Sequence, residues 1–198
     1  MPHYDLFIWQ VALVLLSICV AGVITFFFLR PTPWASETDS AASQSPKEVF
    51  LGSLKLMLNP QMMLLAVTFA YTGLMLTFWS GVYGTSIGFT NKFENAKSLV
   101  GLHGILVGAG EIVGGLAFGI LGKHLARFGR HYPVILGFVV HMGAYVIAFV
   151  NLPANSPIEE TNESAYIEPN PYLAIFGSFL LGLGDACYNT QIYSLIGR

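Results

Sequence analysis

Charged side chains are scarce in this chain of 198 residues. Only 10% of the residues are charged, whereas 54% are hydrophobic. Average soluble domains are about 25% charged, and a soluble fold of this size could not cover its surface with so few charges. The scarcity therefore predicts a protein whose surface lies largely in membrane lipid.

The sequence also lacks the features of a nucleic-acid-binding protein and of an enzyme. Nine Lys and Arg face eleven Asp and Glu, which gives a net charge of −2. Nucleic-acid partners require a basic face, so we expect no such partner. No nucleophile–base pair and no metal-ligand spacing is found, so we expect no enzymatic activity, no metal and no cofactor.

Cysteine is rare, and both copies, Cys19 and Cys187, lie inside apolar runs. We interpret them as buried thiols rather than as a disulfide or a metal pair. The N-terminus lacks the basic segment of a signal peptide, and its apolar run is too long for one. This run is therefore interpreted as a membrane span.

Five long stretches contain at most two Asp, Glu, Lys, Arg or His residues each. Residues 6–29, for example, would form about 36 Å of helix, which is enough to cross a hydrocarbon core of about 30 Å. The predicted spans are residues 6–29, 62–83, 98–121, 133–152 and 172–197. The expected fold class is all-α, a polytopic transmembrane helix bundle in an integral, multi-pass membrane protein.

The connections predict the orientation of these spans. Residues 30–48 are polar and resemble a flexible linker, residues 49–58 could form a short interfacial helix, and residues 84–97 and 122–132 are expected to be loops. Seven of the nine basic residues fall on the side of the linker, and the remaining two are Lys92 and Lys97. The positive-inside rule makes the linker side cytoplasmic.

Residues 153–171 then face the lumen or the exterior. Asn162 begins an Asn-Glu-Ser sequence in this segment, which is the acceptor pattern for N-glycosylation. We therefore predict a glycan at Asn162.

The stretch LVGAGEIVGG (106–115) places a carboxylate, Glu111, within a predicted span. Gly108 and Gly110 could begin a dinucleotide-binding turn, but Val113 occupies the third glycine position and no βαβ pattern surrounds it. At about 100° per residue, Glu111 instead shares a helix face with several glycines. The paired glycines of this face are Gly104, Gly108, Gly115 and Gly119. Because such pairs let helices approach closely, we expect this face to pack against a neighbouring helix.

The last span repeats this design around Asp185. Gly182 and Asn189 share its face, and Asp185 lies near the midpoint of the run. A charge at that depth costs about 2.5–3.5 kcal/mol and usually marks a pathway. The candidate coupling or pathway residues are Glu111, Asp185, Asn189 and His103. The alternative is that the acids are protonated or paired for packing, and that His103 and His141 are structural.

The loop GKHLARFGRH (122–131) resembles the G-x-x-x-D-R-x-G-R-[RK] loop of the major facilitator superfamily. The matching positions are Gly122, Arg127, Gly129 and Arg130. The family acid, which steadies one gate conformation, is replaced by Ala126, so the resemblance does not carry that latch over. In the family this loop is cytoplasmic, which agrees with the orientation predicted from charge.

Two further stretches, residues 71–93 and 180–197, together with the Glu111 helix, are similar to the UNC93-like branch of this superfamily. The resemblance implies a twelve-helix protein of two halves, of which this chain would cover helices six to ten as a truncated product. Residues 1–29 would then be the last helix of the first half, residues 30–58 the cytoplasmic linker, and residues 59–198 an incomplete second half.

Two functions remain open at this point. The first is a secondary transporter of an unknown solute, in which two bundles rock about a site at the bilayer midplane. The second is a non-transporting scaffold that regulates a channel or a receptor, as the resemblance implies for some relatives. Expected partners are membrane lipid, the missing helices and, in the second case, another membrane protein.

Overall fold

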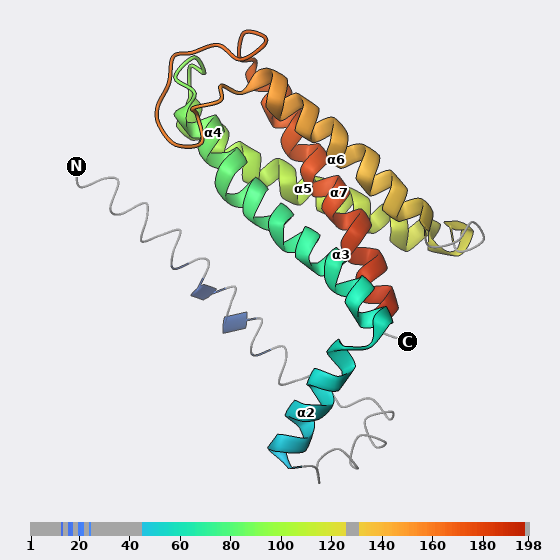
Figure 1. Cartoon of the computed structure of the whole chain (residues 1–198). Helices are drawn as coiled ribbons and strands as arrows, with labels where there is room; N and C mark the ends of the chain where they lie inside the picture. Colours follow the sequence, from blue (N-terminus) through green and yellow to red (C-terminus); the bar gives the residue numbers. More distant parts are fainter. Residues whose placement is uncertain are drawn as a thin grey trace. The chain divides into compact units, whose positions relative to one another are not determined.

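The computed structural model describes residues 45–125 and 131–196, together with six helical positions between residues 13 and 24. The chain divides into two units, Met1–Asn59 and Pro60–Arg198, which are described separately. The described residues are mostly helical, and their β-pairing is an isolated bridge between Thr90 and Thr161. The prediction of an all-α fold is confirmed (Figure 1).

The first unit contains helix α2, Pro46–Met57. Its start is stabilised by Glu48, whose carboxylate accepts a hydrogen bond from the Ser45 backbone N–H at 2.9 Å, and by proline at the first helical position. The predicted short helix is thus confirmed, although it begins at Pro46 rather than at residue 49. Its position at the membrane interface stays a prediction.

The second unit supplies four segments that are long and apolar enough to span a membrane. They are Met62–Phe89, Ala96–Ile120, His131–Asn151 and Pro171–Ser194, with mean hydropathies between 1.2 and 2.1. Four of the five predicted spans are therefore confirmed, and the chain is an integral, multi-pass membrane protein. The predicted span at residues 6–29 lies largely outside the described residues.

The first of these segments joins α3 (Pro60–Thr77), the π-helical η2 (Phe78–Tyr83) and α4 (Gly84–Phe89). The prediction that the loop begins at residue 84 is wrong, because the helix continues to Phe89. The Thr85 and Ser86 hydroxyls donate hydrogen bonds to the carbonyls of Gly81 and Val82, both at 2.7 Å. Their polarity is satisfied inside the helix, which lets a Gly/Ser/Thr-rich stretch remain helical.

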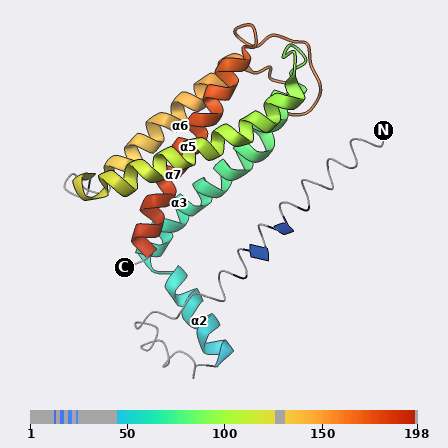
Figure 2. The same ribbon diagram turned by 180° about the vertical axis from the view of Figure 1, so that it is seen from behind.

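Helix α7 (Pro171–Ile196) packs along both α5 (Ala96–Leu125) and α6 (His131–Asn151) (Figures 1 and 2). It meets α5 backbone to backbone. A side chain at Gly182 would collide with the Val107 carbonyl, and one at Gly110 would collide with the Phe179 carbonyl. Glycines on both helices therefore allow the two backbones to approach closely.

The segments 90–95 and 152–170 lie together at one end of the second unit, which we call the loop end (Figure 1). The Thr161 N–H donates to the Phe89 carbonyl at 2.9 Å, and the Asn91 N–H donates to the Thr161 carbonyl at 3.0 Å. Asn151 and Asn170 exchange two further bonds of 2.7 and 2.9 Å. The long connection is thus tied to the helix ends that it joins.

Candidate functional site

Asp185 is buried at the middle of α7, with 8% of its surface exposed. The Asn189 side-chain amide, one helical turn later, donates a hydrogen bond of 2.7 Å to its carboxylate. Glu111 of α5 lies within electrostatic reach of Asp185. The structure therefore brings three of the four candidate pathway residues into one region, where α5 and α7 meet.

Glu111 itself is exposed at the edge of this contact. The face of α5 that packs against the rest of the unit carries a different set of residues. These buried positions are His103, Val107, Gly110, Gly114 and Phe118. In an α-helix, Glu111 lies about 80° around the axis from His103, so it borders the buried face rather than belonging to it.

The four predicted packing glycines lie beside Glu111 on the open side of α5. An added Cβ at Gly104, Gly108, Gly115 or Gly119 would meet no other described atom within 4 Å. Within this chain, α7 is met by Gly110 and Gly114 instead. These two also form a G-x-x-x-G pair. The sequence of α5 therefore contains glycine pairs on two faces, and it does not indicate which face packs against α7. A partner for the open glycine face stays a prediction.

His103 joins three helical segments. Its Nε2 donates to the Trp79 backbone carbonyl at 2.9 Å, since a carbonyl can only accept. In the neutral ring, Nδ1 is then the acceptor for the Ser178 hydroxyl, also at 2.9 Å. Trp79 belongs to η2 and Ser178 to α7, so the ring connects α5 to both. This geometry favours the structural interpretation of His103.

His103 also borders a cavity of about 620 Å³ at the loop end, between η2, α4 and α5. Lys97 and Glu160 contribute charged side chains to this cavity, and Ser80 and Thr85 contribute hydroxyls. With 4% of its surface exposed, His103 forms part of the wall rather than projecting into the space.

His141 is held in a second, aromatic cluster between α3, α6 and α7. The Tyr71 hydroxyl donates to its Nδ1 at 2.6 Å, and its Nε2 donates to the Leu181 carbonyl at 3.2 Å. The ring stacks on Tyr188, with centroids 5.5 Å apart. A side chain at Gly184 would overlap the imidazole. No sequence pattern indicated that Tyr71 and Gly184 contact His141, because they lie on other helices.

The remaining predicted positions are less fully described. Gly122 lies in α5, whereas Arg127, Gly129 and Arg130 fall outside the described residues. Asn162 is exposed in the long connection, and its glycosylation stays a prediction. Cys187 is buried and free, as predicted, and Cys19 falls outside the described residues.

Chemically, this arrangement is a carboxyl group held by an amide in the interior of a membrane bundle. Across residues 45–125 and 131–196, the hydrogen bond found for the Asp185 carboxylate comes from Asn189, a neutral group, and the nearby Glu111 has the same sign of charge. Such a group can take up and release a proton, or contact a cationic solute. The described residues contain no cluster of three or more His, Cys, Asp or Glu side chains suited to a metal ion.

Comparison with known proteins shows which family and which relatives this chain is similar to. Residues 4–198 match the family model described as "Ion channel regulatory protein UNC-93". The chain is 44% identical to the UNC93-like protein MFSD11 of Xenopus laevis and 45% identical to that of Xenopus tropicalis. Both alignments cover 94% of this chain and 46% of the relative, so the chain spans about half the length of these relatives. No solved structure matches the chain.

Proposed function

This chain belongs to the UNC-93 family, and we propose that it forms part of a secondary transporter in which Glu111 and Asp185 couple solute movement to protons. The buried position of Asp185 carries this proposal. A charged carboxylate at the middle of a span costs about 2.5–3.5 kcal/mol, and a neutral amide does not balance the charge. A group in that position gains from binding a proton or a cation, which is what a coupling residue does.

The position of the two acids along their helices agrees with this role. Glu111 lies near the middle of α5 (Ala96–Leu125), and Asp185 lies near the middle of α7 (Pro171–Ile196). Secondary transporters bind solute and coupling ions near the bilayer midplane, where two halves of the fold meet. We propose that the open side of α5, with Glu111 and its glycines, faces such a second half.

The test is solute uptake by vesicles that contain the longest expressed form of the chain. A panel of labelled amino acids, sugars, nucleosides and organic acids is supplied with and without an inward proton gradient. We expect the gradient to raise uptake of at least one class of solute. Glu111→Gln and Asp185→Asn should abolish this stimulation, whereas Glu160→Gln, an acid of the long connection, should retain it. Uptake that ignores the gradient would contradict the coupling role.

A second function, regulation of an ion channel, is favoured by the description of the family model. In that case the open side of α5 would contact a channel subunit instead of another part of a transporter. Its signature is co-purification with a channel and a change in channel current, with no uptake of any solute in the panel. Substitution of Gly108 or Gly115 by Leu would then weaken the complex, because the partner helix could no longer approach.

A further inference from the structure

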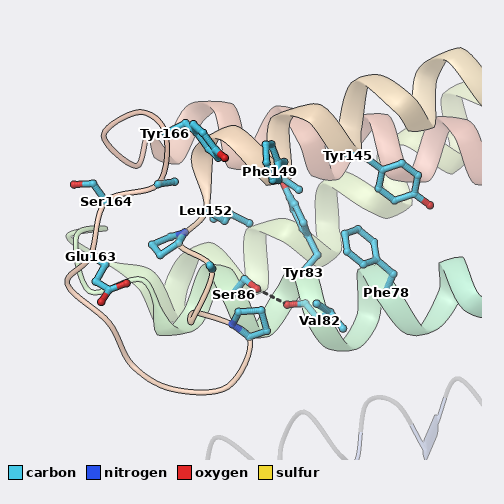
Figure 3. Close-up of a pocket in the computed structure, with 15 residues that line it drawn as sticks. Phe78, Val82, Tyr83, Ser86, Tyr145, Phe149, Leu152, Glu163, Ser164 and Tyr166 are labelled. Atoms are coloured by element: carbon cyan, nitrogen blue, oxygen red, sulfur yellow. Dashed lines mark hydrogen bonds between the residues drawn. The ribbon is translucent and has the colours of Figure 1, made fainter.

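A second cavity at the loop end has a largely apolar lining that includes five aromatic side chains (Figure 3). It has a volume of about 620 Å³, within the range of sites for small organic ligands. Phe78 and Tyr83 reach it from η2, Tyr145 and Phe149 from α6, and Tyr166 from the long connection. It is separate from the Glu111 and Asp185 region, and none of the functions considered above uses it.

The cavity has an apolar end and a polar end. Figure 3 shows Phe78 and Tyr145 at one end, whereas Glu163 and Ser164 lie on the connection at the other. The Phe149 and Tyr166 rings contact each other along one wall, with centroids 4.8 Å apart. This shape suits an elongated ligand with one polar head and an apolar body.

The charge at the polar end is negative. Glu163 receives a hydrogen bond of 3.4 Å from the Asn155 amide, and no described lining residue is Lys, Arg or His. Nearby Lys92 donates to Ser164 at 2.5 Å and to Glu168 at 2.9 Å. The Lys92 ammonium and the Ser164 hydroxyl lower the pKa of the Glu168 carboxyl, so Glu168 stays ionised and neutralises Lys92. Among the described residues, the Glu163 carboxylate forms no ion pair, so the mouth of the cavity keeps a negative charge.

The walls are formed before any ligand binds. The connection is held to the helix ends by the Thr161 and Asn170 backbone bonds. Ser156 is fully buried, and its hydroxyl donates to the Pro153 carbonyl at 2.7 Å. A preformed site avoids the entropic cost of ordering a loop on binding.

We propose that this cavity binds an amphiphilic organic cation, with its ammonium group toward Glu163 and its apolar body among the rings of Phe78, Tyr83, Tyr145, Phe149 and Tyr166. The Glu163 carboxylate supplies a charge of the complementary sign, and the rings supply an apolar surface for the body of the ligand. The same ammonium chemistry occurs in free amines and in choline lipid headgroups. The inference concerns equilibrium binding and does not depend on transport.

The test uses the full chain in an uncharged maltoside detergent and a pair of dansyl-labelled probes. One probe carries a trimethylammonium head, and the other carries a neutral tert-butyl head of the same shape. Fluorescence anisotropy should give a Kd for the cationic probe about tenfold lower than for the neutral one. Equal affinities, or no binding of either probe, would overturn the proposal.

Two variants locate the effect. Glu163→Gln keeps the side-chain shape and the Asn-x-Ser pattern, and it should remove the preference for the cation without changing the affinity of the neutral probe. Tyr166→Leu should weaken the binding of both probes, because it removes one aromatic ring from the wall that contacts the apolar body. Glu160→Gln, in the same connection, is the matched control and should change neither affinity. A preference that survives Glu163→Gln would refute the assignment of the head group.

Short-chain lipids then identify the source of the ammonium group. Dioctanoyl-phosphatidylcholine, but not dioctanoyl-phosphatidylglycerol, should displace the cationic probe if the natural ligand is a lipid headgroup. If neither lipid competes while the cation preference holds, the site takes a free amine. Equal competition by both lipids would show that the cavity recognises acyl chains alone and would overturn the cation assignment.

Discussion

His141 is fixed by contacts with three helices, and each contact determines a different property of the ring. The Leu181 carbonyl places the proton on Nε2, the Tyr71 hydroxyl satisfies Nδ1, and stacking on Tyr188 sets the ring plane. The imidazole is 1% exposed, so an unpaired nitrogen could not turn to water. A buried polar group in a membrane protein is tolerated when every donor and acceptor has a partner.

We predict that Tyr71→Phe lowers the free energy of unfolding by about 1 kcal/mol, because it removes one hydrogen bond and leaves Nδ1 unpaired. The measurement is unfolding by sodium dodecyl sulfate in mixed micelles. Tyr172→Phe, at a side chain that is 85% exposed, is the control and should be neutral. Equal stabilities of the two variants would show that the Tyr71 bond contributes nothing measurable.

At the scale of helices, the contact between α5 and α7 depends on the positions of their glycines. Sequence predicted the spans well, because scarcity of charge over a sufficient length is a direct physical requirement of the bilayer. It also predicted that Glu111 shares one helix face with Gly104 and Gly108, and the partner of that face stays a prediction. It could not say which face meets α7, because that depends on the surface of α7, where Gly182 leaves room for the Val107 carbonyl.

The loop boundary at residue 84 was missed for a related reason. Gly, Ser and Thr favour turns when their hydroxyl groups compete for backbone partners. Here Thr85, Ser86 and Thr90 bond to carbonyls four residues earlier, within the helix itself. Composition alone does not distinguish these two uses of a hydroxyl group. The aromatic cavity was missed because its wall residues are distant in sequence and meet only when the connection folds back.

We predict that Gly182→Ala destabilises the bundle by about 1–3 kcal/mol, because its methyl group collides with the α5 backbone and forces the helices apart. Gly108→Ala, which meets no described atom, should be neutral or slightly stabilising through helix propensity. Unfolding in mixed micelles compares the two in this chain. A loss of similar size in both would argue against the observed contact face.

At the scale of the whole molecule, the charge distribution predicts that the loop end lies outside the cytoplasm. Seven of the nine basic residues fall in the segments that the sequence assigns to the side opposite residues 153–171, and the long connection carries the exposed Asn162 in its glycosylation pattern. Both proposed binding regions then have a defined access. The aromatic cavity would open on the lumenal or extracellular side, and the acids would lie at mid-depth.

Glycosylation of Asn162 tests this orientation. When the chain is expressed in eukaryotic cells, treatment with an N-glycosidase should shift its mobility on a gel, and Asn162→Gln should remove the shift. Asn155→Gln is the control in the same connection. Asn155 is not an acceptor, because Pro157 stands where the pattern requires Ser or Thr. Absence of any shift in the unsubstituted chain would leave the glycan and its topology without support.

Proton entry during solute movement tests the central claim most directly. Vesicles that contain the longest expressed form of the chain are loaded with a pH-sensitive dye and given a transported solute at equal pH on both sides. The account predicts that the solute acidifies the lumen, that Asp185→Asn abolishes the acidification, and that Glu160→Gln leaves it intact. Equal acidification by the Asp185→Asn variant would contradict a coupling role for the buried carboxyl group.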